Sequence, residues 1–90
     1  MNRSNQIMLI CQFLRTWRSS RRISQEKVYH STGIDVCHYE IGRNEPGLKN
    51  LLVLCDYYQI SFTWLLKLTE EVDSGSLSHR EFLTYANFVD

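Results

Sequence analysis

Apolar residues recur along most of the chain at spacings of three and four residues, which is the period of an amphipathic α-helix. Glycines and the single proline mark the breaks between these stretches. The first stretch predicts a helix over residues 5–21, with Ser4 as its N-cap. Its buried face would be formed by Ile7, Ile10, Cys11, Leu14 and Trp17.

A second, short helix is expected to begin after Ser24, whose hydroxyl suits an N-cap, and to end near Thr32. Val28 and Tyr29 would form its inner face. Gly33 can adopt the left-handed backbone conformation that a tight turn between two helices needs. The sequence therefore predicts a turn directly after this helix.

A third helix is predicted over residues 35–41, with Val36 and Tyr39 on its inner face. Gly42 would end it. Pro46 disfavours helical backbone at the residue before it, so the residues after Gly42 are expected to form a loop.

Two further helices are predicted in the leucine-rich middle of the chain. The fourth covers residues 48–58 and would bury Leu48, Leu51, Leu52, Leu54, Cys55 and Tyr58. The fifth begins after Ser61 and contains Phe62, Trp64, Leu65, Leu66 and Leu68. Residues 4–68 would thus form one all-helical domain.

The last part of the chain changes in composition. Residues 69–77 are acidic and then small and polar, which predicts a linker. Ser78 and Glu81 have the spacing of a capping box, which predicts a short helix within residues 78–90 that packs back on the domain or meets a partner. We therefore expect an all-α fold, with a five-helix domain and a short C-terminal helix.

Length and composition fit one small folded domain. The chain has 90 residues, of which 43% are hydrophobic, enough for a modest core. It has no run of about 18 apolar residues, so no transmembrane span is expected. The apolar stretch Ile7–Cys11 is too short for a signal peptide, so we expect a cytoplasmic protein.

Residues that could carry chemistry are few and dispersed. Cys11, Cys37 and Cys55 form no Cys-x-x-Cys pair, so no disulfide framework is expected. His30, Cys37 and His38 lack the spacing typical of zinc ligands. Without a nucleophile–base pair, a glycine-rich phosphate loop or clustered carboxylates, the sequence predicts neither an enzyme nor a bound cofactor or metal.

The net charge is zero, but the charges are unevenly distributed. Residues 1–50 contain eight Lys or Arg and four Asp or Glu, whereas residues 51–90 contain two and six. This asymmetry is typical of a basic working face with an acidic opposite end, although chance clustering on a solvated surface gives the same numbers.

Two short helices joined by a glycine turn, after a longer first helix, form the helix-turn-helix arrangement, and a generic helical bundle would have a similar pattern. Three short motifs occur together and in order: Ser-Gln-Glu at residues 24–26, Thr-Gly at 32–33 and Glu-x-Gly-x-x-x-Pro at 40–46. With them, the chain resembles the Cro/repressor, or XRE-type, helix-turn-helix family over residues 7–68. The resemblance implies a repressor-like fold that binds double-stranded DNA with its third helix.

One spacing departs from the common family pattern. About ten residues usually separate the turn glycine from the glutamate of Glu-x-Gly, whereas Gly33 and Glu40 are seven positions apart. The resemblance therefore implies a shorter variant. Its recognition helix would lack about one turn at the N-terminal end, where the principal base contacts normally lie.

The resemblance implies a set of DNA contacts. Gln25, at the start of the second helix, would hydrogen-bond a phosphate or a base edge. Cys37 and His38 would face the groove, where His38 can donate to a base or a phosphate. Arg43 and Asn44 match positions that meet the sugar-phosphate backbone. For each of these residues, an ordinary exposed side chain is the alternative.

Four further residues complete the predicted site. Lys27 would add long-range attraction to DNA. Asp35 either caps the third helix or accepts a hydrogen bond from a cytosine amine. The resemblance also implies that Arg18 pairs with Glu40 as part of the scaffold, and a bidentate pair would fix the orientation of the third helix.

The function that the resemblance implies is transcriptional regulation, with a repressor binding a palindromic operator as a homodimer. The fifth helix or residues 78–89 would form the dimer interface. The alternative is a protein-interaction module on the same fold, antitoxin-like or a repressor antagonist, with a protein partner for the C-terminal segment. It is favoured by the zero net charge and by the absence of Arg, Lys, Gln and Asn from residues 35–41.

Overall fold

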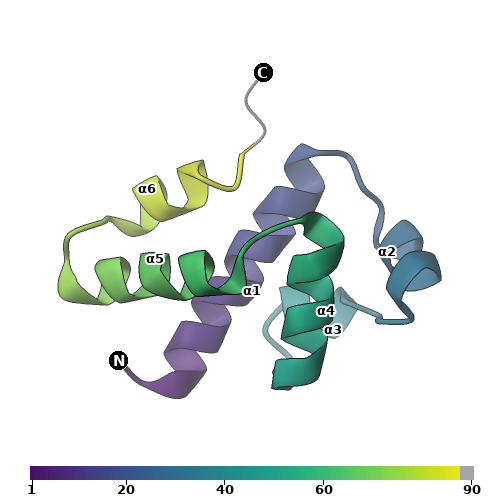
Figure 1. Ribbon diagram of the computed structural model, residues 1–90, viewed down its shortest axis with the longest axis horizontal. Helices are drawn as coiled ribbons and strands as arrows, with labels where there is room; N and C mark the ends of the chain where they lie inside the picture. Colours follow the sequence, from purple (N-terminus) through teal and green to yellow (C-terminus); the bar gives the residue numbers. More distant parts are fainter. Residues whose placement is uncertain (88–90) are drawn as a thin grey trace.

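The computed structural model describes residues 1–87, and all regular secondary structure within this range is helical (Figure 1). The helices are α1 (Arg3–Ser20), α2 (Gln25–Thr32), α3 (Cys37–Glu40), α4 (Leu48–Tyr58), α5 (Phe62–Ser74) and α6 (His79–Thr84). This confirms the predicted all-α class. In Figure 1, α1 crosses the middle of the molecule, with α5 and α6 on one side and α2, α3 and α4 on the other. None of these helices is long and apolar enough to cross a membrane.

The core is one cluster of apolar side chains around Phe13 of α1, which is completely buried. The centroid of its ring lies 5.2 Å from that of Phe82 in α6 and 5.8 Å from that of Trp64 in α5. Val28 from α2 and Leu65 from α5 are also fully buried in the cluster. Burial of each large apolar side chain stabilises the fold by about 1.5–3 kcal/mol. The same core therefore holds α2 and α6 to α1.

Serine hydroxyls begin three helices at the predicted positions. Each accepts a hydrogen bond from the backbone amide three residues further on, at 3.0–3.2 Å: Ser24, Ser61 and Ser78. The Glu81 carboxylate in turn accepts from the Ser78 amide, which completes the predicted capping box. The prediction of Ser4 as the first cap was wrong. Asn2 has that role, because its Oδ1 accepts from the Ser4 amide at 2.7 Å and the chain is already helical at that point.

The prediction of a linker over residues 69–77 was also wrong, because α5 continues to Ser74. Thr69 is fully buried, and its hydroxyl accepts a hydrogen bond from the side-chain amide of Gln6 at 3.0 Å. The three acidic residues that suggested a linker are exposed on α5. Their charge indicated a solvated helix face, which is compatible with continued helix. Gly75, whose φ is +85°, follows as the C-cap.

The C-terminal helix packs on the domain, which was one of the two expectations for this segment. α6 contacts both α1 and α5. After it, the carbonyl of Ala86 accepts hydrogen bonds from the Ser20 hydroxyl at 3.1 Å and from the Arg21 guanidinium at 2.9 Å. Phe88 and Val89, which were part of the predicted apolar face, lie outside the described residues.

Three residues predicted to be buried are exposed: Tyr29, Leu48 and Leu52. Successive side chains on a helix are about 100° apart. Tyr29 therefore need not face the core although the preceding residue, Val28, does. Leu48 and Leu52 are four positions apart and therefore share one outward face of α4. The inward face of α4 carries the other predicted residues, Leu51, Leu54, Cys55 and Tyr58.

Candidate functional site

The helices α2 and α3 form a two-helix unit joined by the turn 33–36 (Figure 1). Gly33 has the predicted left-handed conformation, with φ at +77°, and its amide donates to the carbonyl of Tyr29 at 2.7 Å. The Thr32 hydroxyl accepts from the amide of Ile34 at 3.1 Å. The Thr-Gly pair therefore ends α2 and redirects the chain within a few residues.

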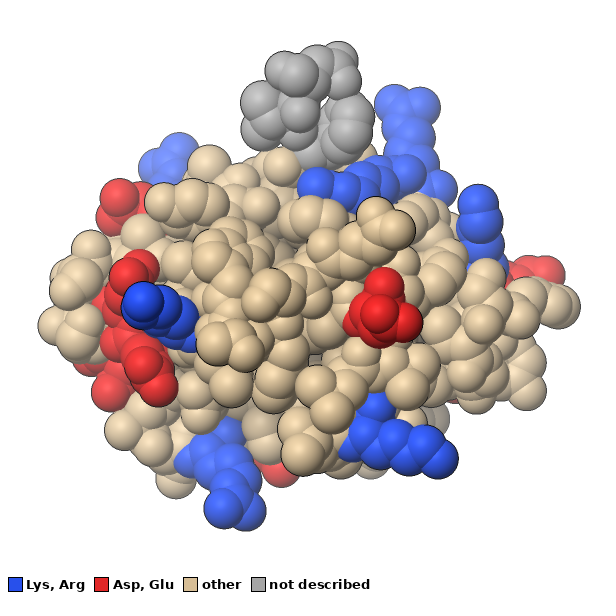
Figure 2. Space-filling view, viewed as in Figure 1, with Lys and Arg blue, Asp and Glu red and all other residues tan. Residues whose placement is uncertain are grey.

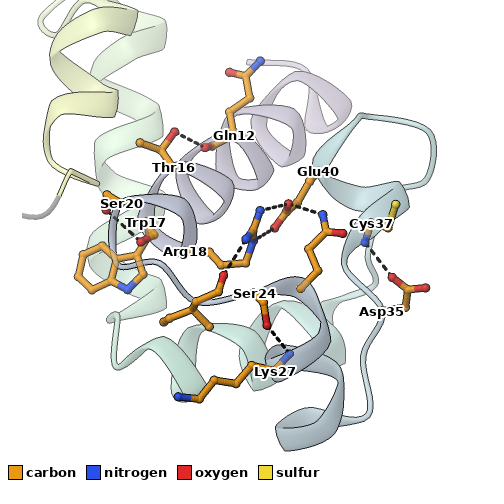
Figure 3. Close-up of polar contacts among 12 residues, drawn as sticks. Gln12, Thr16, Trp17, Arg18, Ser20, Ser24, Lys27, Asp35, Cys37 and Glu40 are labelled. Atoms are coloured by element: carbon orange, nitrogen blue, oxygen red, sulfur yellow. Dashed lines mark hydrogen bonds and ion pairs between the residues drawn. The ribbon is translucent and has the colours of Figure 1, made fainter.

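The third helix is shorter than predicted at both ends, because α3 covers Cys37–Glu40 and the prediction covered residues 35–41. Asp35 Oδ1 accepts from the amide of Cys37 at 3.0 Å, so its side chain satisfies a helix amide from outside the helix (Figure 3). Val36 takes the N-cap position without a side-chain hydrogen bond. At the other end Ile41 already has φ −97° and ψ 4°, which is outside the helical region.

The segment after α3 folds back on that helix. The carbonyl of His38 accepts from the amides of Arg43 and Asn44, at 2.9 and 3.2 Å. The reversal needs the left-handed backbone of Gly42, whose φ is +76°. His38, Arg43 and Asn44 are all exposed, so three of the predicted contact residues lie together at one end of the unit.

The predicted pair of Arg18 and Glu40 is present and bidentate (Figure 3). Arg18 Nε lies 2.7 Å from Glu40 Oε2, and Nη2 lies 2.8 Å from Oε1. The remaining guanidinium nitrogen, Nη1, donates to the carbonyl of Ile23 at 2.7 Å. The hydrogen bond to Glu40 raises the pKa of Arg18 above its ordinary value. The Arg18 guanidinium therefore stays charged, and the bidentate pair fixes α3 to α1.

Gln25 adds a third hydrogen bond to the Glu40 carboxylate. Its Nε2 donates to Glu40 Oε1 at 2.9 Å. An ionised carboxylate only accepts hydrogen bonds, so the nitrogen rather than the oxygen of the amide must face it. Gln25 was expected to contact DNA, and its partner in the free protein is instead the glutamate at the end of α3. No sequence pattern indicated this contact, because it depends on how α2 and α3 are oriented.

Tyr58 of α4 is a further neighbour of this network, which no sequence pattern indicated. A small cavity of about 10 Å³ is lined by residues that include Cys11, Glu40, Pro46 and Tyr58. Among the described residues, the Tyr58 hydroxyl is buried and has no hydrogen-bond partner. Burial and the charge of Glu40 raise the pKa of Tyr58, so the phenol stays neutral.

The remaining predicted residues are not all brought together. Cys37 is half-buried beside the exposed Asp35. Lys27 is exposed on the first turn of α2, and its side chain extends away from Asp35 and Cys37 (Figure 3). A contiguous patch would therefore contain His38, Arg43 and Asn44, with Lys27 at a separate position on α2.

The charges near α2 and α3 are mixed. Glu26, Asp35 and Glu45 are exposed in the same segment as Lys27 and Arg43. On the face drawn in Figure 2, basic side chains are scattered around the edge of the molecule. Acidic side chains gather at the left, where α5 ends in Figure 1. The acidic end expected from the charge asymmetry is therefore visible at the C-terminal part of α5.

No group of three His, Cys, Asp or Glu side chains within residues 1–87 is placed to hold a metal ion. Burial raises the pKa of the Cys11 and Cys55 thiols to about 11, so both stay protonated near neutral pH. Protein-family models, curated proteins and solved structures were each compared with the chain, and none matches.

Proposed function

We propose that this protein is a sequence-reading DNA-binding protein that acts as a transcriptional regulator, with α3 and the loop after it directed at the major groove. The observation that carries the proposal is the cluster of His38, Arg43 and Asn44. All three side chains are exposed. The backbone amides of Arg43 and Asn44 donate to the carbonyl of His38, which keeps the three residues adjacent. An imidazole, a guanidinium and an amide can donate to phosphate oxygens and base edges.

The roles divide between the helix and the loop. A single helical turn can reach only a few base pairs, so α3 would offer Cys37 and His38 to the groove. Arg43 and Asn44 would contact the sugar-phosphate backbone and set the register. Lys27 lies further along α2 and would contribute long-range attraction that salt screens.

A reading element this short favours binding as a homodimer, because two copies double the number of base contacts. Two-fold symmetric copies would read half-sites about 34 Å apart, one helical turn of DNA. A dimer on a palindromic site is the arrangement expected of a repressor that competes for a promoter.

The test is binding of the purified protein to a fluorescent, random-sequence DNA pool, followed by anisotropy at low and near-physiological salt. The retained DNA is then sequenced. We expect affinity that falls steeply with salt and an enriched palindrome. Absence of binding even at low salt would exclude the DNA-binding proposal.

The second candidate is a protein-interaction module, favoured by a groove beside α3. The groove has a volume of about 600 Å³ and lies between α1 and residues 39–45. Met8 and Ile41 line it and are 48% and 62% exposed. Apolar side chains beside mixed charges suit a protein partner better than a phosphate backbone. Loss of DNA binding in Met8→Ser and Ile41→Ser would argue against this candidate, because the groove would then serve DNA binding.

A further inference from the structure

The carboxylate of Glu40 joins three helices. Two hydrogen bonds come from Arg18 of α1 and one from Gln25 of α2, while Glu40 is itself the last residue of α3. The Glu40 side chain is only 5% exposed, so these bonds form in a largely dry environment where they are strong. The contact of Gln25 is therefore a direct side-chain link from the first turn of α2 to the end of α3.

We propose that Gln25 is a positioning residue for DNA recognition, which sets the orientation of α3 and of residues 41–44 through Glu40. The proposal rests on the proposed function and deepens it, because it assigns Gln25 to the protein scaffold rather than to a direct phosphate or base contact.

The short length of α3 makes its position depend on contacts with other helices. A four-residue helix has a single turn and cannot hold its own shape in water. Its packing is against α1, while α2 packs against α4. The bond from Gln25 thus adds a constraint between the two helices of the unit. The backbone amides of Arg43 and Asn44 donate hydrogen bonds to the carbonyl of His38. A shift of α3 would therefore move all three residues together.

The first measurement needs no DNA. Amide hydrogen exchange of residues 37–44 is compared in the unmodified protein and in Gln25→Met, which keeps the length of the side chain and removes the donor. Gln6→Met is the matched control, because it removes another glutamine hydrogen bond, to Thr69, far from α3 along the chain. We expect exchange in residues 37–44 to rise about tenfold in Gln25→Met, the effect of losing one hydrogen bond to a charged group. The control should leave it unchanged.

The second measurement uses the DNA selected from the pool. For a positioning residue, Gln25→Met should lower affinity for the selected site about tenfold. Affinity for unrelated DNA and the dependence on salt should stay the same, because no phosphate contact is lost. A merely structural defect would lower both affinities, since it reduces the folded fraction.

Two outcomes would overturn the proposal. One is unchanged exchange in residues 37–44 of Gln25→Met, which would show that the bond does not constrain α3. The other is a weaker salt dependence with equal loss on both DNAs, which identifies a direct phosphate contact. If the unmodified protein binds no DNA, the proposed function fails, and the exchange experiment still decides whether Gln25 orders α3.

Discussion

The guanidinium of Arg18 meets both carboxylate oxygens of Glu40, at 2.7 and 2.8 Å, and so fixes the end of α3 to the last turns of α1. The side chains are 14% and 5% exposed, so solvent screens the pair only weakly. Glu40 also accepts from Gln25, which brings α2 into the same network. One carboxylate thereby determines how the two-helix unit sits on the longest helix of the domain.

The first prediction concerns this carboxylate. Glu40→Gln would leave the Arg18 guanidinium nearly buried and without its counter-charge, so we expect a loss of about 3 kcal/mol in the free energy of unfolding. The measurement is urea denaturation at neutral pH. Glu26→Gln is the control, because Glu26 is an exposed carboxylate whose contact with His30 at 3.5 Å should contribute less than about 0.5 kcal/mol. Equal losses in the two variants would contradict the prediction.

The second prediction concerns the Tyr58 hydroxyl, which is buried and has no hydrogen-bond partner among residues 1–87. Replacing Tyr58 by Phe removes this hydroxyl, a polar group that burial has separated from water. Tyr58→Phe should therefore be neutral or stabilise the protein by up to about 1 kcal/mol in the same denaturation experiment. Tyr57→Phe on the half-buried neighbour is the control. A loss of more than about 1 kcal/mol would mean that the hydroxyl bonds a water molecule in the adjoining cavity.

Much of the fold could be predicted from the sequence because its breaks are chemically distinct. The serine caps and the left-handed glycine at position 33 act locally, so both ends of α2 and the starts of α5 and α6 follow from the residues themselves. The prediction of a linker at residues 69–77 was wrong because acidic composition indicates only that side chains are exposed to solvent. The buried Thr69 shows that the opposite face of the same helix still packs on the core.

The candidate site was less predictable, since it depends on distances between helices. The pair of Arg18 and Glu40 could be expected only through the family resemblance. The resemblance implies which residues meet in three dimensions, whereas the spacing of residues along the chain does not. The contact of Gln25 with Glu40 and the nearness of Tyr58 had no sequence signal, because both depend on how helices distant in sequence are oriented. The start of α3 was misplaced because Asp35 lies outside the helix, where its Oδ1 accepts from the amide of Cys37 in the first turn.

The third prediction concerns the turn between α2 and α3. Gly33 has φ +77°, and a Cβ built on it would meet no atom within 4 Å, so only backbone strain opposes substitution. Gly33→Ala should lower the free energy of unfolding by about 1 kcal/mol. Gly33→Asn should lower it less, because Asn adopts the left-handed region more readily. The same loss in both variants would indicate that something other than φ limits this position.

The fourth prediction concerns pH and the start of α6. The hydrogen bond from the backbone amide of Ser78 lowers the pKa of Glu81 below its ordinary value of 4.5, and the Ser78 side chain lowers it further by a smaller amount. A lowered pKa in the folded state means that the stabilisation is present above pH 4.5 and is lost as the pH falls through the lower, folded pKa. Carbon NMR of the Glu81 carboxyl should show this lowered pKa, and Ser78→Ala should move it back toward 4.5. A pKa at or above 4.5 in the unmodified protein would contradict the prediction.

The last prediction separates the proposed DNA face from the rest of the surface. Arg43 is exposed beside His38, while Arg80 is exposed on α6, which packs on α1 and α5. If Arg43 neutralises one phosphate, Arg43→Ala should weaken DNA binding and reduce the slope of log affinity against log salt by about one. Arg80→Ala removes the same charge and should leave the slope unchanged. Equal reductions in both variants would show that DNA binding responds to net charge alone, and the cluster around His38 would then have no special role in contacting the phosphate backbone.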